Sequence, residues 1–109
     1  SNIIGAGYMY LRQQGGVIVN IASDLSVIAP NQDLYPDDQV KPSSYSALKH
    51  GVIGLTKWYA STLAPKVRVN AISPGGIYNN QSVDFVEKIT KLIPMRRMAD
   101  KGDVGGTLE

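Results

Sequence analysis

The sequence has 109 residues, 43% of them hydrophobic and 18% charged, which is the composition of a folded globular domain or part of one. The net charge of +2, without a basic run, gives no ground for a nucleic-acid partner, and no apolar run reaches the roughly 18 residues of a membrane span. The absence of cysteine excludes disulfides, thiolate metal sites and cysteine nucleophiles, and it is compatible with the cytoplasmic location that we expect.

The first part of the chain predicts a helix, a strand and a long loop. Residues 2–13 have the pattern of a helix that has already begun, and Gly15 and Gly16 end it. Residues 17–23, VIVNIAS, are apolar and β-branched, which is typical of a strand buried on both faces. Residues 24–44 contain several prolines and an acidic cluster, and we expect a loop of that length to be functional or mobile.

A helix of about 19 residues follows, and Pro65 ends it. We expect Ser43 or Ser44 to supply its N-cap, with Pro42 just outside. Spacings of 4, 3 and 4 indicate an apolar stripe that packs against the rest of the fold, formed by Leu48, Val52, Leu55 and Tyr59.

Three further residues of this helix bear on packing and on metal binding. Gly51 and Gly54 each cost a helix about 1 kcal/mol relative to alanine, so we expect close packing at these positions, with tolerated surface glycine as the alternative. His50 is the only histidine, and we expect it to be a solvated helix residue. We therefore expect no metal site.

The last part of the chain predicts a second strand and two more helices. Residues 67–73, VRVNAIS, form the strand, which the residues Pro74, Gly75 and Gly76 stop. Apolar residues at helical spacing indicate a helix over residues 82–93, closed by a proline. Residues 99–109 have the pattern of the start of another helix. Alternating strands and helices predict an α/β fold with a parallel βαβ unit. Two strands alone do not make a stable doubly wound sheet, so we expect the chain to be part of a larger domain.

Four features of the sequence are expected at one edge of this unit. It is the edge at the carboxyl ends of the parallel strands, where ligands bind in such folds. Ser23 ends the first strand, and residues 74–76 follow the second. Tyr45 lies in the first turn of the crossover helix, and Lys49 is stacked on it one turn later. This convergence indicates an active edge.

The chemistry of these residue types suits proton transfer. A free tyrosine has a pKa near 10 and is a poor base, but a nearby ammonium favours the phenolate. Ser23 could hold a carbonyl or alcohol oxygen while Tyr45 gives or takes the proton. No side chain accepts a hydride, so a redox reaction needs a cofactor. The plainer alternatives are a surface pair for Tyr45 and Lys49, a turn-forming Ser23, and an ordinary turn at residues 74–76.

Three stretches, GGVIVNIAS, YSALK with HGVIGLTK, and VRVNAISPGGI, resemble in order three consecutive signatures of the short-chain dehydrogenases/reductases. The resemblance covers nearly the whole chain. It implies a Rossmann-type doubly wound parallel sheet of which residues 1–109 form the catalytic and C-terminal part, without the N-terminal dinucleotide-binding half. It also implies NAD or NADP as the cofactor and a homodimer or homotetramer as the assembly.

The resemblance also implies a role for each residue at the edge. Ser23 orients the substrate, Tyr45 is the proton donor or acceptor, and Lys49 lowers the tyrosine pKa and binds the nicotinamide ribose. Further cofactor contacts are implied at Pro74, Gly75, Gly76, Ile77 and Asn79. Of these, Asn79 stands where the family usually has threonine and is an expected substitute for it.

The loop between the two catalytic positions departs from the family pattern. Ser23 and Tyr45 are 22 residues apart, more than the family commonly shows. The surplus falls in the loop rich in proline and aspartate. We therefore hypothesise that residues 30–42 shape the substrate pocket.

Three further stretches point to a narrower group within the family and so to a class of substrate: ASDLSVIAPNQDLY, SPGGIYN and IPMRRMAD. They are similar to short-chain dehydrogenases found with bacterial surface-sugar and flagellin-modification genes, which are thought to serve the synthesis of sialic-acid-like sugars. A carbonyl–alcohol interconversion on a sugar or sugar nucleotide is therefore expected. The alternative within the family is a 3-oxoacyl-carrier-protein reductase. An alternative of another class is a truncated, non-catalytic fragment that serves assembly alone.

Overall fold

The computed structural model describes residues 13–108. Its helices and strands are β1 (Gly16–Ile21), α2 (Ser43–Leu63), β2 (Val67–Ile72), α3 (Val83–Leu92) and α4 (Lys101–Leu108), with two short 3-10 turns, η1 (Asp24–Ser26) and η2 (Gln32–Leu34), between β1 and α2. The predicted α/β order and both predicted strands are therefore confirmed. The helix expected over residues 2–13 lies almost wholly outside the described residues.

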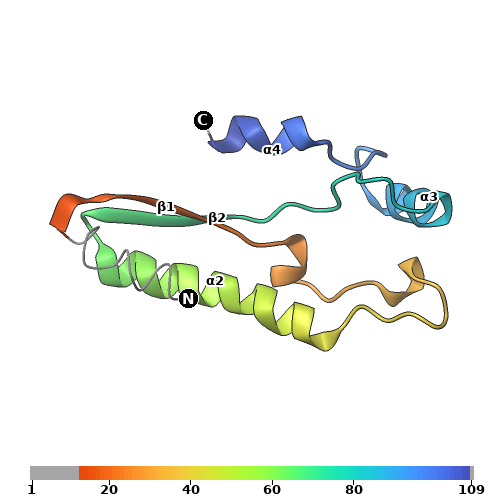
Figure 1. Ribbon diagram of the computed structural model, residues 1–109, viewed down its shortest axis with the longest axis horizontal. Helices are drawn as coiled ribbons and strands as arrows, with labels where there is room; N and C mark the ends of the chain where they lie inside the picture. The colour runs from red at the N-terminus through yellow and green to blue at the C-terminus, as the bar shows by residue number, and fades with distance from the viewer. Residues whose placement is uncertain (1–12, 109) are drawn as a thin grey trace.

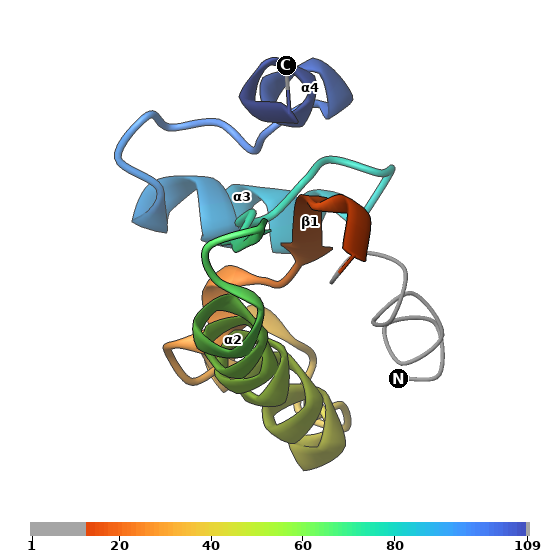
Figure 2. The ribbon, with the colours of Figure 1, turned by 90° about the vertical axis from the view of Figure 1, so that its left-hand side faces the viewer.

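The two strands form a parallel sheet. β1 pairs with β2 in a register that runs from Gly16 opposite Val67 to Ile21 opposite Ile72. Figure 1 shows α2 lying along one face of this pair and returning the chain to the start of β2. α3 lies beyond the carboxyl ends of the strands, and α4 lies on the side of the sheet opposite α2, as the end-on view confirms (Figure 2). The turn region between β1 and α2 therefore occupies the same edge as α3.

The hydrophobic core lies between α2 and the sheet. Its buried residues are Leu63, Val67 and Val69, against which Ile18, Tyr59 and Ala60 pack. Burial of these side chains provides the main driving force for holding the helix on the sheet. A polar contact adds to it, because Asn20 Nδ2 donates to Thr56 Oγ1 at 3.0 Å and Thr56 Oγ1 donates to the Val52 carbonyl at 2.7 Å. β1 is thus fixed to the middle of α2 at a buried threonine.

The apolar stripe predicted for α2 is confirmed only in part, because Tyr59 packs on the core and Val52 is half-buried, while its other two members are exposed. Leu48 and Leu55 are 72% and 47% exposed, whereas Thr56 and Leu63 are buried against the sheet. The face toward the sheet also contains the small and polar residues Ala60 and Thr56, so counting large apolar residues alone placed Leu48 and Leu55 on the wrong side. Gly51 and Gly54 also face open space, since a Cβ at either would meet no atom within 4 Å. The alternative of a tolerated surface glycine therefore holds within the described part of the chain.

The predicted cap of α2 is also wrong. The helix begins at Ser43, the N-cap residue is Pro42, and no side chain caps the helix. Pro42 is extended, with φ −60° and ψ 141°, and its carbonyl accepts the Tyr45 N–H at 3.1 Å, so the chain turns into the helix without help from a serine. Ser82 does cap α3, because its side chain accepts the Phe85 N–H.

The face of β1 that is turned away from α2 carries exposed apolar residues, namely Val17, Val19 and Ile21. They alternate along the strand with residues that face the helix, as the two-residue period of a strand requires. No helix within residues 13–108 combines the length and apolarity needed to span a membrane.

Val67 supplies a test of this core, because it is only 2% exposed. Val67→Ala in the complete protein removes two buried methyl groups and is expected to lower the free energy of unfolding by about 2 kcal/mol. Urea denaturation measures this change. The matched control Val83→Ala, at a position 74% exposed at the start of α3, is expected to change it by less than about 0.5 kcal/mol. Equal effects of the two substitutions would contradict the assigned core.

Candidate active site

A pocket of about 210 Å³ opens at the carboxyl edge of the sheet. Its walls come from the end of β1, the turn region before α2, the first turn of α2, the segment after β2, and α3. Four of the residues expected at the site line this pocket, namely Ser23, Tyr45, Gly75 and Gly76. The other expected residues lie near the same edge without lining it: Lys49, Pro74, Ile77 and Asn79.

Ser23 is buried and caps the turn η1. Its Oγ accepts the Leu25 N–H at 3.1 Å and donates to Asp24 Oδ1 at 3.0 Å. The Ser23 N–H in turn donates to Ser26 Oγ at 3.0 Å, which completes a reciprocal capping box. Ser23 therefore does form a turn, as the plainer alternative for this residue expected. This turn also explains why β1 ends at Ile21 and not at residue 23.

Tyr45 is half-buried, and two ammonium groups lie near its ring. Lys49 Nζ is 5.8 Å from the ring centroid, as expected for stacked residues four apart on a helix. Lys41 Nζ lies closer, at 4.1 Å. Both distances are within the range of a cation–π contact. The phenol is therefore held in a region of positive charge.

The segment after β2 is tied to the end of β1 by backbone hydrogen bonds. The Ala22 N–H donates to the Ile72 carbonyl at 2.8 Å, and the Asp24 N–H donates to the Pro74 carbonyl at 3.0 Å. These bonds continue the pairing of the strands beyond their ends. They place Ser23 beside the glycines at residues 75 and 76.

The next residues are held by a bridge to Ala99. The Ala99 N–H donates to the Gly76 carbonyl at 2.9 Å, and the Tyr78 N–H donates to the Ala99 carbonyl at 2.8 Å. The amide and carbonyl of Ile77 therefore face away from Ala99. The Ile77 carbonyl accepts Gln81 Nε2 at 2.9 Å, and no acceptor within residues 13–108 takes the Ile77 N–H.

Gln81 and Gly76 shape this segment further. The Oε1 of Gln81 accepts the Asn79 N–H at 2.7 Å, so one side chain connects to both Ile77 and Asn79. A Cβ at Gly76 would lie 3.0 Å from Met98 Cε and 3.1 Å from Ile89 Cδ1. Only glycine lets the chain pass here without displacing these side chains.

The loop over residues 30–42 contributes a wall of the pocket. Pro30, Asn31, Leu34, Tyr35 and Lys41 line it. The Tyr35 ring packs on the Phe85 ring of α3, with centroids 5.6 Å apart, and the Lys41 N–H donates to Gln32 Oε1 at 3.0 Å. The loop thus lines the same pocket as Ser23 and Tyr45, and its role in shaping a substrate pocket stays a hypothesis.

Sequence reasoning missed three residues that line the pocket, Asp24, Gln81 and Phe85, and it expected Tyr35 and Lys41 only as part of the pocket loop at residues 30–42. Lys41 is four residues before Tyr45, a spacing that could have signalled it. Because Pro42 separates the two, however, helical stacking could not be assumed. The contact between Tyr35 and Phe85 joins segments 50 residues apart and depends on tertiary structure.

A larger cavity of about 560 Å³ adjoins the pocket. It shares the wall at Gly75 and Gly76, but Ser23 and Tyr45 do not line it. Its other walls are mostly apolar side chains of the loop and of α3. The smaller pocket, which Ser23 and Tyr45 line, is therefore the candidate active site. No cluster of three metal-ligating side chains occurs within the described residues.

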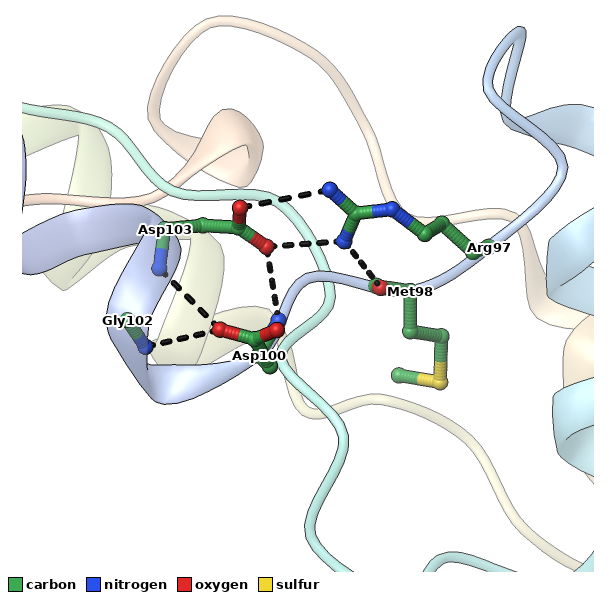
Figure 3. A network of polar contacts seen from close by, with 5 residues as sticks. All are labelled: Arg97, Met98, Asp100, Gly102 and Asp103. Carbon is green, nitrogen blue, oxygen red and sulfur yellow. Dashed lines mark hydrogen bonds and ion pairs between the residues drawn. The ribbon is translucent and has the colours of Figure 1, made fainter.

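An ion pair fixes the turn that leads into α4 (Figure 3). Arg97 donates through both terminal nitrogens to the Asp103 carboxylate, at 2.8 and 3.2 Å, and the Asp100 N–H donates to the same carboxylate at 2.9 Å. The hydrogen bonds from Arg97, followed by the one from the Asp100 backbone, lower the pKa of Asp103 from an ordinary value of 3.8 to about 2. The turn carries Ala99, so this pair helps to hold the bridge to Gly76.

Comparison with known proteins agrees with this arrangement. A family model described as "Enoyl-(Acyl carrier protein) reductase" matches residues 4–108. The structure resembles the crystal structure of a short chain dehydrogenase from Leptospira borgpetersenii with bound NAD+, with a TM-score of 0.88 and 33% identity over 97% of this chain and 41% of that one. The chain belongs to the short-chain dehydrogenase/reductase family. The expected Rossmann-type sheet, present only in part, is confirmed with it.

Two curated relatives in this family have the same sequence identity to this chain. The post-translational flagellin modification protein A of Campylobacter coli is 36% identical over 101 residues, which cover 91% of this chain and 40% of the relative. A 3-oxoacyl-[acyl-carrier-protein] reductase of Synechocystis is 36% identical over 103 residues, which cover 92% of this chain and 38% of the relative. The chain spans about two fifths of the length of the dehydrogenases and reductases that it matches.

The ion pair of Arg97 and Asp103 supplies a pH-dependent test. The pKa of Asp103 is lowered on folding, so the pair's contribution to stability is fully present above pH 3.8 and is lost as the pH falls toward about 2. An NMR titration of the complete protein is expected to find the Asp103 carboxyl mostly ionised at pH 3. Arg97→Gln is expected to raise this pKa, whereas Lys101→Gln, next to the same turn, is expected to leave it unchanged. A midpoint near 3.8 in the unchanged protein would contradict the pair.

Proposed function

We propose that the complete protein is an NAD(P)-dependent oxidoreductase that interconverts a carbonyl and an alcohol by hydride transfer, with Tyr45 as the general acid/base. One observation carries the proposal: Ser23, Tyr45 and the two glycines after β2 line a single pocket at the carboxyl edge of the sheet, in a chain of the short-chain dehydrogenase/reductase family. Family membership and pocket geometry together support this reaction over the assembly-only alternative.

The residues beside the pocket fit a nicotinamide. Gly75 and Gly76 line the pocket, and the Ile77 N–H is directed away from the bridge to Ala99 with no acceptor within residues 13–108. We propose that residues 74–77 contact the nicotinamide, that the Ile77 backbone meets its carboxamide, and that Lys49 and Tyr45 meet its ribose. Asn79 is proposed to contact the cofactor as well. The bound nicotinamide, as NAD or NADP, supplies or accepts the hydride that no side chain here can carry.

The protein side of the reaction is a proton transfer at the substrate oxygen. In the reducing direction Tyr45 donates its phenolic proton to that oxygen, and in the oxidising direction it takes the proton back. The Lys49 ammonium, on the same helix face, stabilises the negative charge that develops on the tyrosine oxygen. Ser23 donates a hydrogen bond to the substrate oxygen after its hydroxyl turns away from Asp24.

We propose a sugar or sugar nucleotide of surface-polysaccharide or flagellin modification as the substrate. The relative from Campylobacter coli supports this proposal. The alternative, a 3-oxoacyl-carrier-protein reductase, is supported by the relative from Synechocystis at the same identity. Initial rates of NAD(P)H oxidation with a keto sugar nucleotide and with a 3-oxoacyl thioester separate the two, because only one of them is expected to be reduced efficiently.

A homodimer or homotetramer is proposed as the assembly. The outer face of α2 supports this, since Leu48, Leu55 and Trp58 are exposed there beside the open glycines at residues 51 and 54. An apolar helix face with small residues allows a second helix to approach closely.

Tyr45→Phe tests the proposed role of the phenol in the complete protein. The substitution keeps the ring and removes the proton, so kcat for carbonyl reduction is expected to fall by a factor of about 10² to 10⁴. The absorbance of NAD(P)H at its usual wavelength measures the rate. Tyr59→Phe, on the same helix but in the core, is the matched control and is expected to keep the rate. Full activity in Tyr45→Phe would rule out the assigned acid/base.

A second test separates the enzyme from an assembly-only chain. Titration with NAD(P)H, followed by cofactor fluorescence, is expected to show binding by the complete protein. A polypeptide of residues 1–109 alone is expected to bind much more weakly, because it offers contacts only to the nicotinamide end. Absence of binding by the complete protein would favour the assembly-only alternative.

A further inference from the structure

Lys41 places a second cation at the site, and it comes from the loop and not from α2. Its Nζ lies 4.1 Å from the centroid of the Tyr45 ring, closer than the Nζ of Lys49 at 5.8 Å. Lys41 lines the pocket, whereas Lys49 does not. Its backbone is fixed by the hydrogen bond from its N–H to Gln32 Oε1, and Pro42 restricts the chain directly after it. The backbone from which this ammonium extends is therefore held by the loop.

The Lys41 ammonium has no partner of opposite charge in the described part of the chain. The same loop carries three carboxylates, Asp33, Asp37 and Asp38, yet none lies within 4.0 Å of it, and the ion pairs among residues 13–108 join Lys88 to Asp84 and Arg97 to Asp103. This lysine instead lies over the aromatic ring of the catalytic group.

The other charged residue that lines the pocket is Asp24, and its carboxylate already has donors. Asp24 Oδ1 accepts hydrogen bonds from Ser23 Oγ and from the Leu25 N–H, at 3.0 and 2.8 Å. The charge of Asp24 is thus partly satisfied within the turn η1. The charge of Lys41 has no such hydrogen bond within residues 13–108, so the pocket offers a cation to an incoming group.

We propose that Lys41 binds an anionic group of the substrate, a carboxylate or a phosphate, close to the carbon that reacts at Tyr45. The ammonium lies over the ring whose hydroxyl meets the substrate oxygen, and a pocket of about 210 Å³ leaves little room between the two groups. An ammonium with three rotatable donors binds either oxyanion. Turnover of such a substrate rests on the proposed function, whereas binding of the anion does not.

Isothermal titration calorimetry on the complete protein with NAD(P)+ bound, which cannot reduce the ketone probes, tests this proposal. The probes are acetoacetate, its neutral methyl ester, and hydroxyacetone phosphate. Lys41→Met keeps the apolar stem of the side chain and removes the charge. It is expected to weaken binding of the two anions about tenfold, the loss of one charge-assisted hydrogen bond, and to leave the neutral ester unchanged. If Lys41→Met weakens binding of only one of the two anions, that anion identifies whether the site prefers a carboxylate or a phosphate.

Two further variants complete the design. Lys41→Arg keeps the charge and is expected to restore anion binding to within a few fold. Lys57→Met, on the exposed outer face of α2, is the matched control and is expected to leave all three affinities unchanged. Equal affinity for the anions in the unchanged protein and in Lys41→Met, undetectable binding in both included, overturns the proposal. Equal weakening of the neutral ester also overturns it, because Lys41 would then act through packing alone.

Rates measured with the same probes keep the two proposals apart. If anion binding depends on Lys41 but no carbonyl compound is reduced, the anion site is supported and the proposed function is refuted. If carbonyl compounds are reduced at rates that depend neither on Lys41 nor on substrate charge, the proposed function is supported and the anion site is refuted.

Discussion

The parallel pairing of β1 with β2 is the constraint on which the site depends. Parallel strands need a crossover that starts at the carboxyl end of the first strand, so α2 must begin at the edge where both strands end. The pairing then continues past the strands through the hydrogen bonds from Ala22 to Ile72 and from Asp24 to Pro74. Ser23, Gly75 and the first turn of α2 are brought to one edge by these bonds, although they are far apart in the sequence.

The two faces of α2 have different surroundings. One face is fixed on the sheet by the core around Val67 and by the contact between Asn20 and Thr56, and this fixes the position of Tyr45 relative to the strand ends. The other face is apolar and open within the described residues, with Trp58 at 56% exposure. The helix therefore holds Tyr45 at the pocket on one side and leaves an apolar surface on the other.

The sequence predicted the elements well because each signal was local. Both strands were predicted from apolar β-branched runs, although β1 is exposed on one face within the described residues. Pro65 ended α2, and the stacking of Lys49 on Tyr45 follows from the helical repeat alone. The errors arose where packing decides. The helix buried Thr56 in place of Leu55, since the Asn20 amide satisfies that hydroxyl inside the fold. Lys41 was expected only as part of the pocket loop, because its approach to the Tyr45 ring depends on a loop conformation that no periodicity encodes.

A crystal structure of the complete protein with NAD(P)+ and a bound alcohol or inhibitor tests the central claim most directly, that this edge is a catalytic site. The account predicts that the nicotinamide lies against residues 74–77 and that the reacting oxygen lies within about 2.6–3.2 Å of both Tyr45 Oη and Ser23 Oγ. A nicotinamide bound elsewhere, or a Ser23 hydroxyl that stays on Asp24 while the substrate oxygen contacts neither group, would contradict it.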